Sequence, residues 1–333
     1  MKGMSFQGFA DLSLAGQCLT REQCHGVLEC PDEDILALLD AAYRVRRRAF
    51  GNQVRVQVLT NAKSGLCPED CRYCSQSSAS SAQIEKYPLL SSARLLEDAR
   101  AAKQTGAWRF CMALSGRNVA EKEMDALCAA IRAIKAETGI PLCCSLGFVS
   151  SDQARRLRQA GLDRVNHNLN TGPRFYDRIC TTHTYQDRLD NVTRCKGAGL
   201  EICCGGIIGQ GESDDDIIDM LLDLREIAPQ AIPINFLIPI QGTPFENVKT
   251  DLNPLRCLKA LCLARFLHPQ CEIRAAAGRE YHLRSLQPLA FYAADSIFVS
   301  GYLTTGGQPA DEAFGMIADA GFERVAEGNG LEP

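Results

Sequence analysis

The sequence of 333 residues has little excess charge and no long hydrophobic run. Its 36 Lys and Arg nearly balance its 40 Asp and Glu, which argues against a general nucleic-acid binder, since such proteins carry a basic surface. No uncharged apolar run approaches the roughly 18 to 20 residues that a membrane-spanning helix needs. The stretch 1–16 also has no apolar core of signal-peptide length. We therefore expect a cytoplasmic protein without nucleic-acid or membrane partners.

Cysteine is unusually frequent, with 17 residues. This content is too sparse for a small disulfide scaffold and too high for an ordinary cytosolic enzyme. The count is odd, two pairs are immediate neighbours (Cys143 with Cys144, and Cys203 with Cys204), and no secretory signal precedes them, so a disulfide framework is disfavoured. Thiolates that act as metal ligands fit this pattern better.

Short β-branched or apolar runs alternate with longer amphipathic stretches, which predicts strand-helix repeats and a parallel sheet. The candidate strands are 54–59, 108–114, 141–146, 163–169, 201–207, 232–238, 271–275 and 296–299. Such repeats have the length of a (β/α)₈ TIM-type barrel, with an open doubly wound sheet as the alternative. We expect an α/β fold in which 1–50 form a helical N-terminal segment, 51–310 the barrel and 311–333 a helical C-terminal tail.

A CxxxCxxC motif follows the first predicted strand, in a loop that contains Gly and Pro. Its ligands would be Cys67, Cys71 and Cys74. Zinc sites usually take four ligands in two separated pairs, whereas three closely spaced cysteines leave one iron of a [4Fe-4S] cluster without a protein ligand. That open iron can bind a reagent. Three unrelated core cysteines are a poor alternative, because a polar loop offers no core and unprotected neighbouring thiols oxidise.

The motif, with an aromatic residue before its last cysteine, resembles that of the radical S-adenosylmethionine (SAM) enzymes. Further segments extend the resemblance to the biotin synthases over roughly 50–310. In chain order they are CPEDCRYCSQSS, RFCMAL, VNHNLNTGPRFY, TTHTYQDRLD, GGIIGQGE, IPINFLIPIQGTP, IRAAAGRE and SIFVSGYLTT. The resemblance implies a radical SAM sulfurtransferase that inserts sulfur into dethiobiotin to form biotin. It also implies a radical borne by the cofactor, without a catalytic side chain.

A second group of cysteines lies within separate predicted strands, as does one arginine. These residues are Cys111, Cys143, Cys203 and Arg274. In a barrel they can meet at the axis, where thiols and an unpaired cation conflict with the usual aliphatic filling unless they bind something. The resemblance implies that they hold an auxiliary [2Fe-2S] cluster that supplies the sulfur.

Two extra thiols, Cys144 and Cys204, each follow one of these proposed ligands. Because neighbours in a strand point to opposite faces, we expect both to face the helix layer. A bulge that turned them inward would allow a larger four-iron auxiliary cluster, so both readings stay open. Cysteines elsewhere, such as Cys180, receive no role, because buried cysteine is a common small hydrophobic residue.

Three asparagines, Asn166, Asn168 and Asn170, alternate along one predicted strand and are expected to share a face. Amides both donate and accept hydrogen bonds, which suits ribose hydroxyls and a ureido group. The resemblance implies that Asn168 and Asn170 contact the SAM ribose, and that Asn166, Asn168 and Asn235 face the dethiobiotin ring. Asn170 stands where many relatives have Asp.

The remaining contacts are also carried by the resemblance. Arg188 suits the SAM carboxylate, since its guanidinium can form a bidentate pair. Tyr73 is expected beside the adenine, and the Gly-rich loop 205–212, with Ile207, is expected to approach the adenosine closely. For Thr304 and Thr305 we expect a contact with the dethiobiotin carboxylate, with turn capping as the alternative.

Two other functions remain possible from the sequence. A radical SAM enzyme of hydrogenase maturation or of the pyrrolysine pathway would share the loop cysteines but not the asparagines, Arg274 and the late threonines together. A non-catalytic iron-sulfur carrier would need only cysteines. The resemblance further leads us to expect a homodimer and an electron donor such as flavodoxin or ferredoxin.

Overall fold

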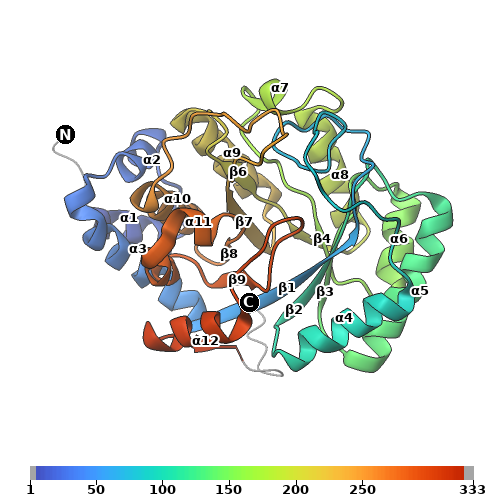
Figure 1. Cartoon of the computed structure of the whole chain (residues 1–333). Helices are drawn as coiled ribbons and strands as arrows, with labels where there is room; N and C mark the ends of the chain where they lie inside the picture. The colour runs from blue at the N-terminus through green and yellow to red at the C-terminus, as the bar shows by residue number, and fades with distance from the viewer. Residues whose placement is uncertain (1–4, 326–333) are drawn as a thin grey trace.

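The computed structural model describes residues 5–325, and its central feature is a closed parallel barrel (Figure 1). The strands are β1 (Gln53–Lys63), β2 (Arg109–Leu114), β3 (Leu142–Ser145), β4 (Arg164–Asn166), β5 (Glu201–Cys203), β6 (Gly206–Ile208), β7 (Ala231–Phe236), β8 (Glu272–Ala275) and β9 (Ser296–Val299). Neighbouring strands pair in parallel around the barrel, in which β5 and β6 both pair with β7. The last strand, β9, pairs with β1 and closes the sheet. The predicted (β/α)₈ TIM-type barrel is confirmed, and the open doubly wound sheet is excluded.

Helices surround this barrel and cover its outer face (Figure 1). They are α4 (Ser92–Gln104), α5 (Glu121–Thr138), α6 (Ser151–Ala160), α8 (Tyr185–Gly197), α9 (Asp214–Ile227), α10 (Pro254–Leu267), α11 (Arg279–Leu283) and the 3₁₀ segment η2 (Arg284–Tyr292). The short helix α7 (Tyr176–Ile179) lies instead at one end of the barrel (Figure 1) and packs with Cys71 and Cys180. The main hydrophobic core fills the space between strands and helices. Within 5–325, no helix is both long and apolar enough to cross a membrane.

The segments before and after the barrel pack on its outside. The first holds α1 (Phe6–Leu14), α2 (Arg21–Leu28), η1 (Asp32–Asp34) and α3 (Ile35–Phe50), which lie against α10. The second holds α12 (Ala310–Asp319) and a short strand, β10 (Glu323–Arg324), which pairs with the start of β1. The expected helical tail therefore also contains a strand, and its end, 326–333, lies outside the described residues.

The single strand expected over 201–207 is wrong in detail, because it is broken between β5 and β6. Both halves pair with β7, but Gly205 lies between them. A Cβ atom at Gly205 would lie 2.0 Å from the carbonyl oxygen of Pro233. The break thus depends on a residue without a side chain, which lets the backbone pass close to β7.

The strand expected over 163–169 is also shorter than predicted, since β4 ends at Asn166. Beyond it, Asn170 has a positive φ of 74°, a left-handed conformation that asparagine tolerates better than most residues. Its backbone nitrogen donates to the carbonyl of Gly205, and its carbonyl accepts from Ile207. The segment after β4 is therefore irregular and is not a continuation of the strand. It is joined to the chain around β6 by these two hydrogen bonds of Asn170.

Candidate active site

A cavity of about 310 Å³ lies at the carboxyl ends of the barrel strands, which is where TIM barrels place their active sites. Its wall includes the loop cysteines Cys67, Cys71 and Cys74, together with Cys111 and Cys143 from strands. One cavity thus brings together the loop cysteines and two of the three strand cysteines, while Cys203 does not line it.

The loop cysteines lie between β1 and α4. Cys71 is buried, whereas Cys67 and Cys74 are partly exposed. The amide of Cys74 donates to the carbonyl of Cys71 over 3.1 Å, which folds the CxxC half into a turn. Burial raises the pKa of Cys74 to about 11 and also raises that of Cys67. Free thiols are therefore the stable form here, and metal binding would release their protons.

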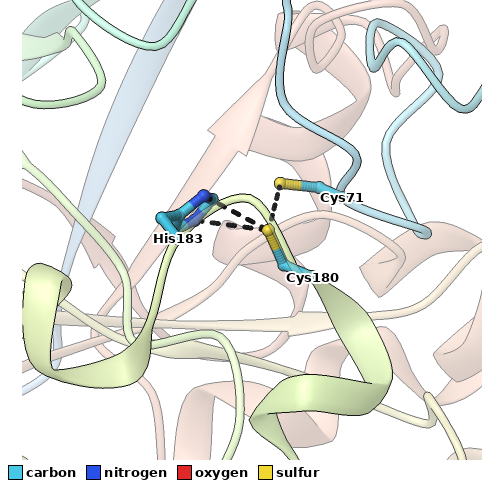
Figure 2. Close-up of side chains that lie close together, drawn as sticks. All are labelled: Cys71, Cys180 and His183. Carbon is cyan, nitrogen blue, oxygen red and sulfur yellow. Dashed lines mark hydrogen bonds between the residues drawn. The ribbon is translucent and has the colours of Figure 1, made fainter.

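Cys71 contacts Cys180, which in turn contacts His183; both of these residues lie in the segment after α7 (Figure 2). The sulfurs of Cys71 and Cys180 are 3.8 Å apart, and Nδ1 of His183 lies 3.2 Å from the Cys180 sulfur. The hydrogen bond with Cys71 lowers the pKa of Cys180 to about 5 in the metal-free chain, while it raises that of Cys71. The sequence analysis missed Cys180, because no local spacing links residues 109 positions apart.

Two acidic residues fasten the cysteine loop to the same segment. Asp70 accepts hydrogen bonds from the backbone amides of Thr181, over 2.9 Å, and Thr182, over 3.2 Å. Glu69 accepts from the Thr182 hydroxyl over 2.5 Å and pairs with His183. The loop is therefore positioned by side chains inside the CxxxCxxC motif that are not themselves metal ligands.

Arg188 of α8 lies buried beside this loop and lines the cavity. Its Nη1 donates to the carbonyl of Asn168 over 2.9 Å, its Nη2 lies 2.8 Å from Nε2 of His183, and its Nε donates to the Tyr176 hydroxyl. Each terminal nitrogen carries a second N–H. Two N–H groups on adjacent nitrogens therefore remain for a ligand carboxylate.

The three asparagines all line the cavity, although they do not share one strand face. The expected continuous strand is wrong because β4 ends at Asn166, but the three side chains still face the same cavity. Nδ2 of Asn166 lies 3.1 Å from Oδ1 of Asn168 and 3.3 Å from the Cys203 sulfur. Nδ2 of Asn170 donates to the Tyr73 hydroxyl over 2.6 Å. Tyr73 and Asn170 therefore form a pair that crosses from the cysteine loop to the segment after β4.

The other predicted contact residues also line the cavity: Ile207, Asn235, Thr304 and Thr305. The amide of Asn235 is engaged by backbone, since it donates to the Gly206 carbonyl over 2.9 Å and accepts from Ala277 over 3.2 Å. The hydroxyl of Thr305 donates to the Tyr302 carbonyl over 2.8 Å, which is the turn contact weighed as the alternative. The Thr304 hydroxyl lies 2.8 Å from that of Ser75.

The strand cysteines form a second buried cluster inside the barrel, with Ala231, Ala276 and Phe298. Cys111 on β2 and Cys143 on β3 are direct neighbours in the sheet register. Hydrogen bonding with Cys111, together with burial, raises the pKa of Cys143 to about 12. Nη1 of Arg274 on β8 lies 3.6 Å from the sulfur of Cys203 on β5. Four strands thus bring these polar groups together in the interior.

Cys144 and Cys204 lie on the opposite face of their strands. Both are fully buried in the main core between barrel and helices, and neither lines the cavity. No bulge turns Cys144 inward, since β3 pairs with β2 in regular register through Cys143 and Cys144, and Cys204 directly follows the end of β5. The alternation of side chains along the chain accounts for this placement.

Two family models match the chain. One, described as Radical SAM superfamily, covers 63–224, and the other, described as Biotin and Thiamin Synthesis associated domain, covers 233–323. The biotin synthase of Bacillus subtilis (strain 168) is 47% identical over 94% of this chain and 93% of its own length. That of Rhodopirellula baltica is 46% identical over 96% of this chain and 88% of its own length.

The chain belongs to the biotin synthase family. It is a radical SAM enzyme, and membership in that superfamily implies a [4Fe-4S] cluster and SAM as cofactors. The non-catalytic carrier that the sequence left open is thereby excluded.

Solved structures share the fold of this biotin synthase family member at low identity. Methylornithine synthase (PylB) superposes with a TM-score of 0.84 at 18% identity, over 95% of this chain and 97% of that chain. The FeFe-hydrogenase maturase HydG from Carboxydothermus hydrogenoformans gives 0.81 at 17% identity, over 96% and 79%. Identity to the biotin synthases is far higher, so the alternative radical SAM functions are not supported by sequence.

The donors in the cavity fit a [4Fe-4S] cluster and SAM. Three thiols in one loop leave one iron of such a cluster open. In addition, Nε2 of His167 is buried, lines the cavity and has no hydrogen-bond partner within 5–325. Burial and the charge of Arg188 lower the pKa of His167 well below its usual value, so its ring is neutral. A buried polar atom without a protein partner indicates that the cavity receives a polar ligand.

Proposed function

We propose that this chain converts dethiobiotin to biotin, using SAM, with sulfur taken from an auxiliary iron-sulfur cluster. The observation that carries the proposal is one cavity whose wall contains the three loop cysteines, the asparagines, and Cys111, Cys143 and Arg274 of the strand group. One cavity allows a reagent bound at the loop cysteines and a sulfur source in the barrel to reach the same substrate. Separate cavities would have favoured two independent functions.

The loop cysteines, Cys67, Cys71 and Cys74, would hold the [4Fe-4S] cluster. When bound, this cluster and SAM supply a radical able to remove hydrogen from an unactivated carbon. The protein's part is to bind and orient the reactants and to exclude water. The buried position of Cys71 and the fastening of the loop by Glu69 and Asp70 keep the cluster site at the cavity wall.

For SAM we propose contacts from Tyr73, Asn168, Asn170, Arg188 and Ile207. Arg188 lines the cavity beside the cysteine loop, and its remaining N–H groups would bind the carboxylate of the methionine half. The Tyr73 and Asn170 pair lies on the same side. For Asn170, which stands where many relatives have Asp, one N–H donates to the Tyr73 hydroxyl, so the second N–H and Oδ1 would be left for the ribose.

For dethiobiotin we propose Asn166, Asn168, Asn235, Thr304 and Thr305. Asn166 is the best placed of these, because its amide touches Cys203 and so lies between the cavity and the auxiliary site. The hydroxyl of Thr304 and the backbone around Thr305 would receive the carboxylate. The hydroxyl and the backbone N–H of Thr305 both donate to the Tyr302 carbonyl, so Thr305 would act by holding the turn that presents Thr304.

The auxiliary cluster would be held by Cys111, Cys143, Cys203 and Arg274. We propose the [2Fe-2S] form over a larger four-iron cluster, because Cys144 and Cys204 lie in the outer core. Partners of the reaction are dethiobiotin and a one-electron donor such as flavodoxin or ferredoxin. The family resemblance further supports a homodimer.

The test is anaerobic reconstitution with iron and sulfide, followed by incubation with SAM, a reductant and dethiobiotin. Biotin and 5′-deoxyadenosine should both form. Asn168→Ala should lose biotin formation with its iron content intact, whereas the exposed Asn247→Ala serves as the matched control and should retain activity. Cleavage of SAM without consumption of dethiobiotin in the wild type would contradict the proposed substrate.

A further inference from the structure

The guanidinium of Arg274 is fixed on two of its three nitrogens. Its Nε donates to the Ser296 hydroxyl over 3.1 Å, and its Nη2 donates to Oε1 of Glu272 over 2.5 Å. The remaining nitrogen, Nη1, lies 3.6 Å from the Cys203 sulfur. Because the side chain is only 1% exposed, the direction in which Nη1 points is set by these protein contacts and not by solvent.

Glu272 is itself held firmly. Its Oε2 accepts from Nη1 of Arg164 over 2.8 Å, and its Oε1 also accepts from Nε2 of Gln57 over 2.5 Å. The side-chain oxygen of the same residue, Gln57 Oε1, in turn lies 3.4 Å from the sulfur of Cys111. The carboxylate of Glu272 therefore contacts Arg274 directly. It is also linked to Cys111 through the side chain of Gln57.

Two features make this carboxylate more than a counter-charge. First, the carboxylate binds Nη2, the terminal nitrogen of Arg274 that does not face Cys203. Second, hydrogen bonds from Gln57 and Arg164 hold the carboxylate in place, so it cannot move with the guanidinium. Residues bound to a metal are commonly oriented by partners that hold their other polar atoms, and loss of such a partner weakens metal retention.

We propose that Glu272 is a positioning residue of the auxiliary site, which holds Nη2 of Arg274 so that Nη1 faces the auxiliary cluster. This inference rests on the proposed function, because it presupposes that Cys111, Cys143, Cys203 and Arg274 hold that cluster. Glu272 does not touch the reacting atoms. Its effect reaches the cluster through Arg274.

The test compares Glu272→Gln with Glu201→Gln. Glu201 accepts from Nε of the same Arg164 over 2.8 Å, and among the described residues it has no hydrogen bond to Arg274. Both proteins are reconstituted anaerobically, and the Mössbauer spectrum of the auxiliary cluster and its rate of loss to a chelator are measured. The [4Fe-4S] cluster of the loop serves as an internal reference. Glu272→Gln should lose the auxiliary cluster about 10 to 100-fold faster, whereas Glu201→Gln should match the wild type.

A second comparison separates positioning from a general structural role. In an Arg274→Met background, Glu272→Gln should cause no further change in the auxiliary spectrum or in its rate of loss, because the group it positions is absent. An equal additional change in that background would overturn the inference. If Glu272→Gln fails to fold, Glu272→Asp keeps the charge and withdraws the carboxylate by one methylene. An unaltered auxiliary spectrum in that variant would also overturn it.

Failure of the inference and failure of the proposed function give different results. If Arg274→Met alters the auxiliary cluster and Glu272→Gln does not, only the positioning role is wrong. If the wild type holds no second cluster, or if Arg274→Met leaves it unchanged, the proposed auxiliary ligands are wrong.

Discussion

The two cysteine groups of this enzyme both contribute to one cavity, the strand group through Cys111 and Cys143, but they are built in different ways. Cys67, Cys71 and Cys74 lie on one loop, whereas Cys111, Cys143 and Cys203 lie on three strands. The loop group is positioned by its own short spacing and by contacts from Glu69 and Asp70. The strand group is positioned only by closure of the barrel. A local motif can therefore be recognised from spacing, while the second site exists only once the fold is complete.

The groups also differ in access. Cys67 and Cys74 are partly exposed, while the strand cysteines are each 4% exposed or less. An open site suits a cluster that exchanges a bound reagent at every turnover. An enclosed site suits a cluster whose sulfide is to be delivered to a carbon and kept from water. The comparison predicts that the two groups can be inactivated separately.

The largest effect is expected from Cys71→Ala. It removes a buried ligand of the loop group, so both 5′-deoxyadenosine and biotin should fall to background, while the spectrum of the auxiliary cluster should persist. Both products are measured by chromatography after anaerobic reconstitution. SAM cleavage at the wild-type rate in this variant would contradict the assignment of the loop cysteines.

Cys143→Ala should give the complementary result. Biotin formation should be lost because the auxiliary cluster is lost, but SAM should still be cleaved to 5′-deoxyadenosine, since the loop group is intact. The ratio of the two products separates this outcome from general damage. Loss of both products in a protein that retains its [4Fe-4S] spectrum would show that the two sites are not independent.

Arg188→Lys is expected to have an intermediate effect on the loop side alone. Lysine keeps the charge but loses the planar pair of N–H groups, so the KM for SAM should rise about tenfold. The KM for dethiobiotin should stay near its wild-type value. The matched control is Arg178→Lys, an exposed arginine on α7. Equal increases in both KM values would show that Arg188 acts through folding and not through SAM.

The smallest effect is expected from Cys144→Ala and Cys204→Ala, which sharpen the comparison between the two faces of one strand. Each removes a buried sulfur from the outer core, so the free energy of unfolding should fall by about 1 kcal/mol per substitution. Iron and sulfide per chain should not change. Denaturant unfolding of the metal-free chains, with metal analysis of the reconstituted ones, measures both quantities. A loss of iron would make these thiols ligands.

The sequence predicted the barrel well, because strand-helix periodicity and the glycines that end helices are local signals. The CxxxCxxC spacing of the loop is a local signal of the same kind, and the proposed [4Fe-4S] site rests on it. The prediction failed where a tertiary contact overrides the pattern: the close approach of Gly205 to Pro233 breaks β5 from β6, and the left-handed Asn170 ends the alternation of the asparagines. The sequence contains no signal for Cys180, because its partner Cys71 is 109 positions away. It contains none for Glu272, because its partner Arg274 lies two residues away in a strand of ordinary composition.

The most direct test of the two-site account is Mössbauer analysis of the anaerobically reconstituted wild type beside a Cys111→Ala/Cys143→Ala/Cys203→Ala variant. The account predicts about six irons per chain in the wild type, as a [4Fe-4S] and a [2Fe-2S] component, and about four in the variant, with only the [4Fe-4S] component left. About four irons in both proteins, with identical spectra, would contradict it.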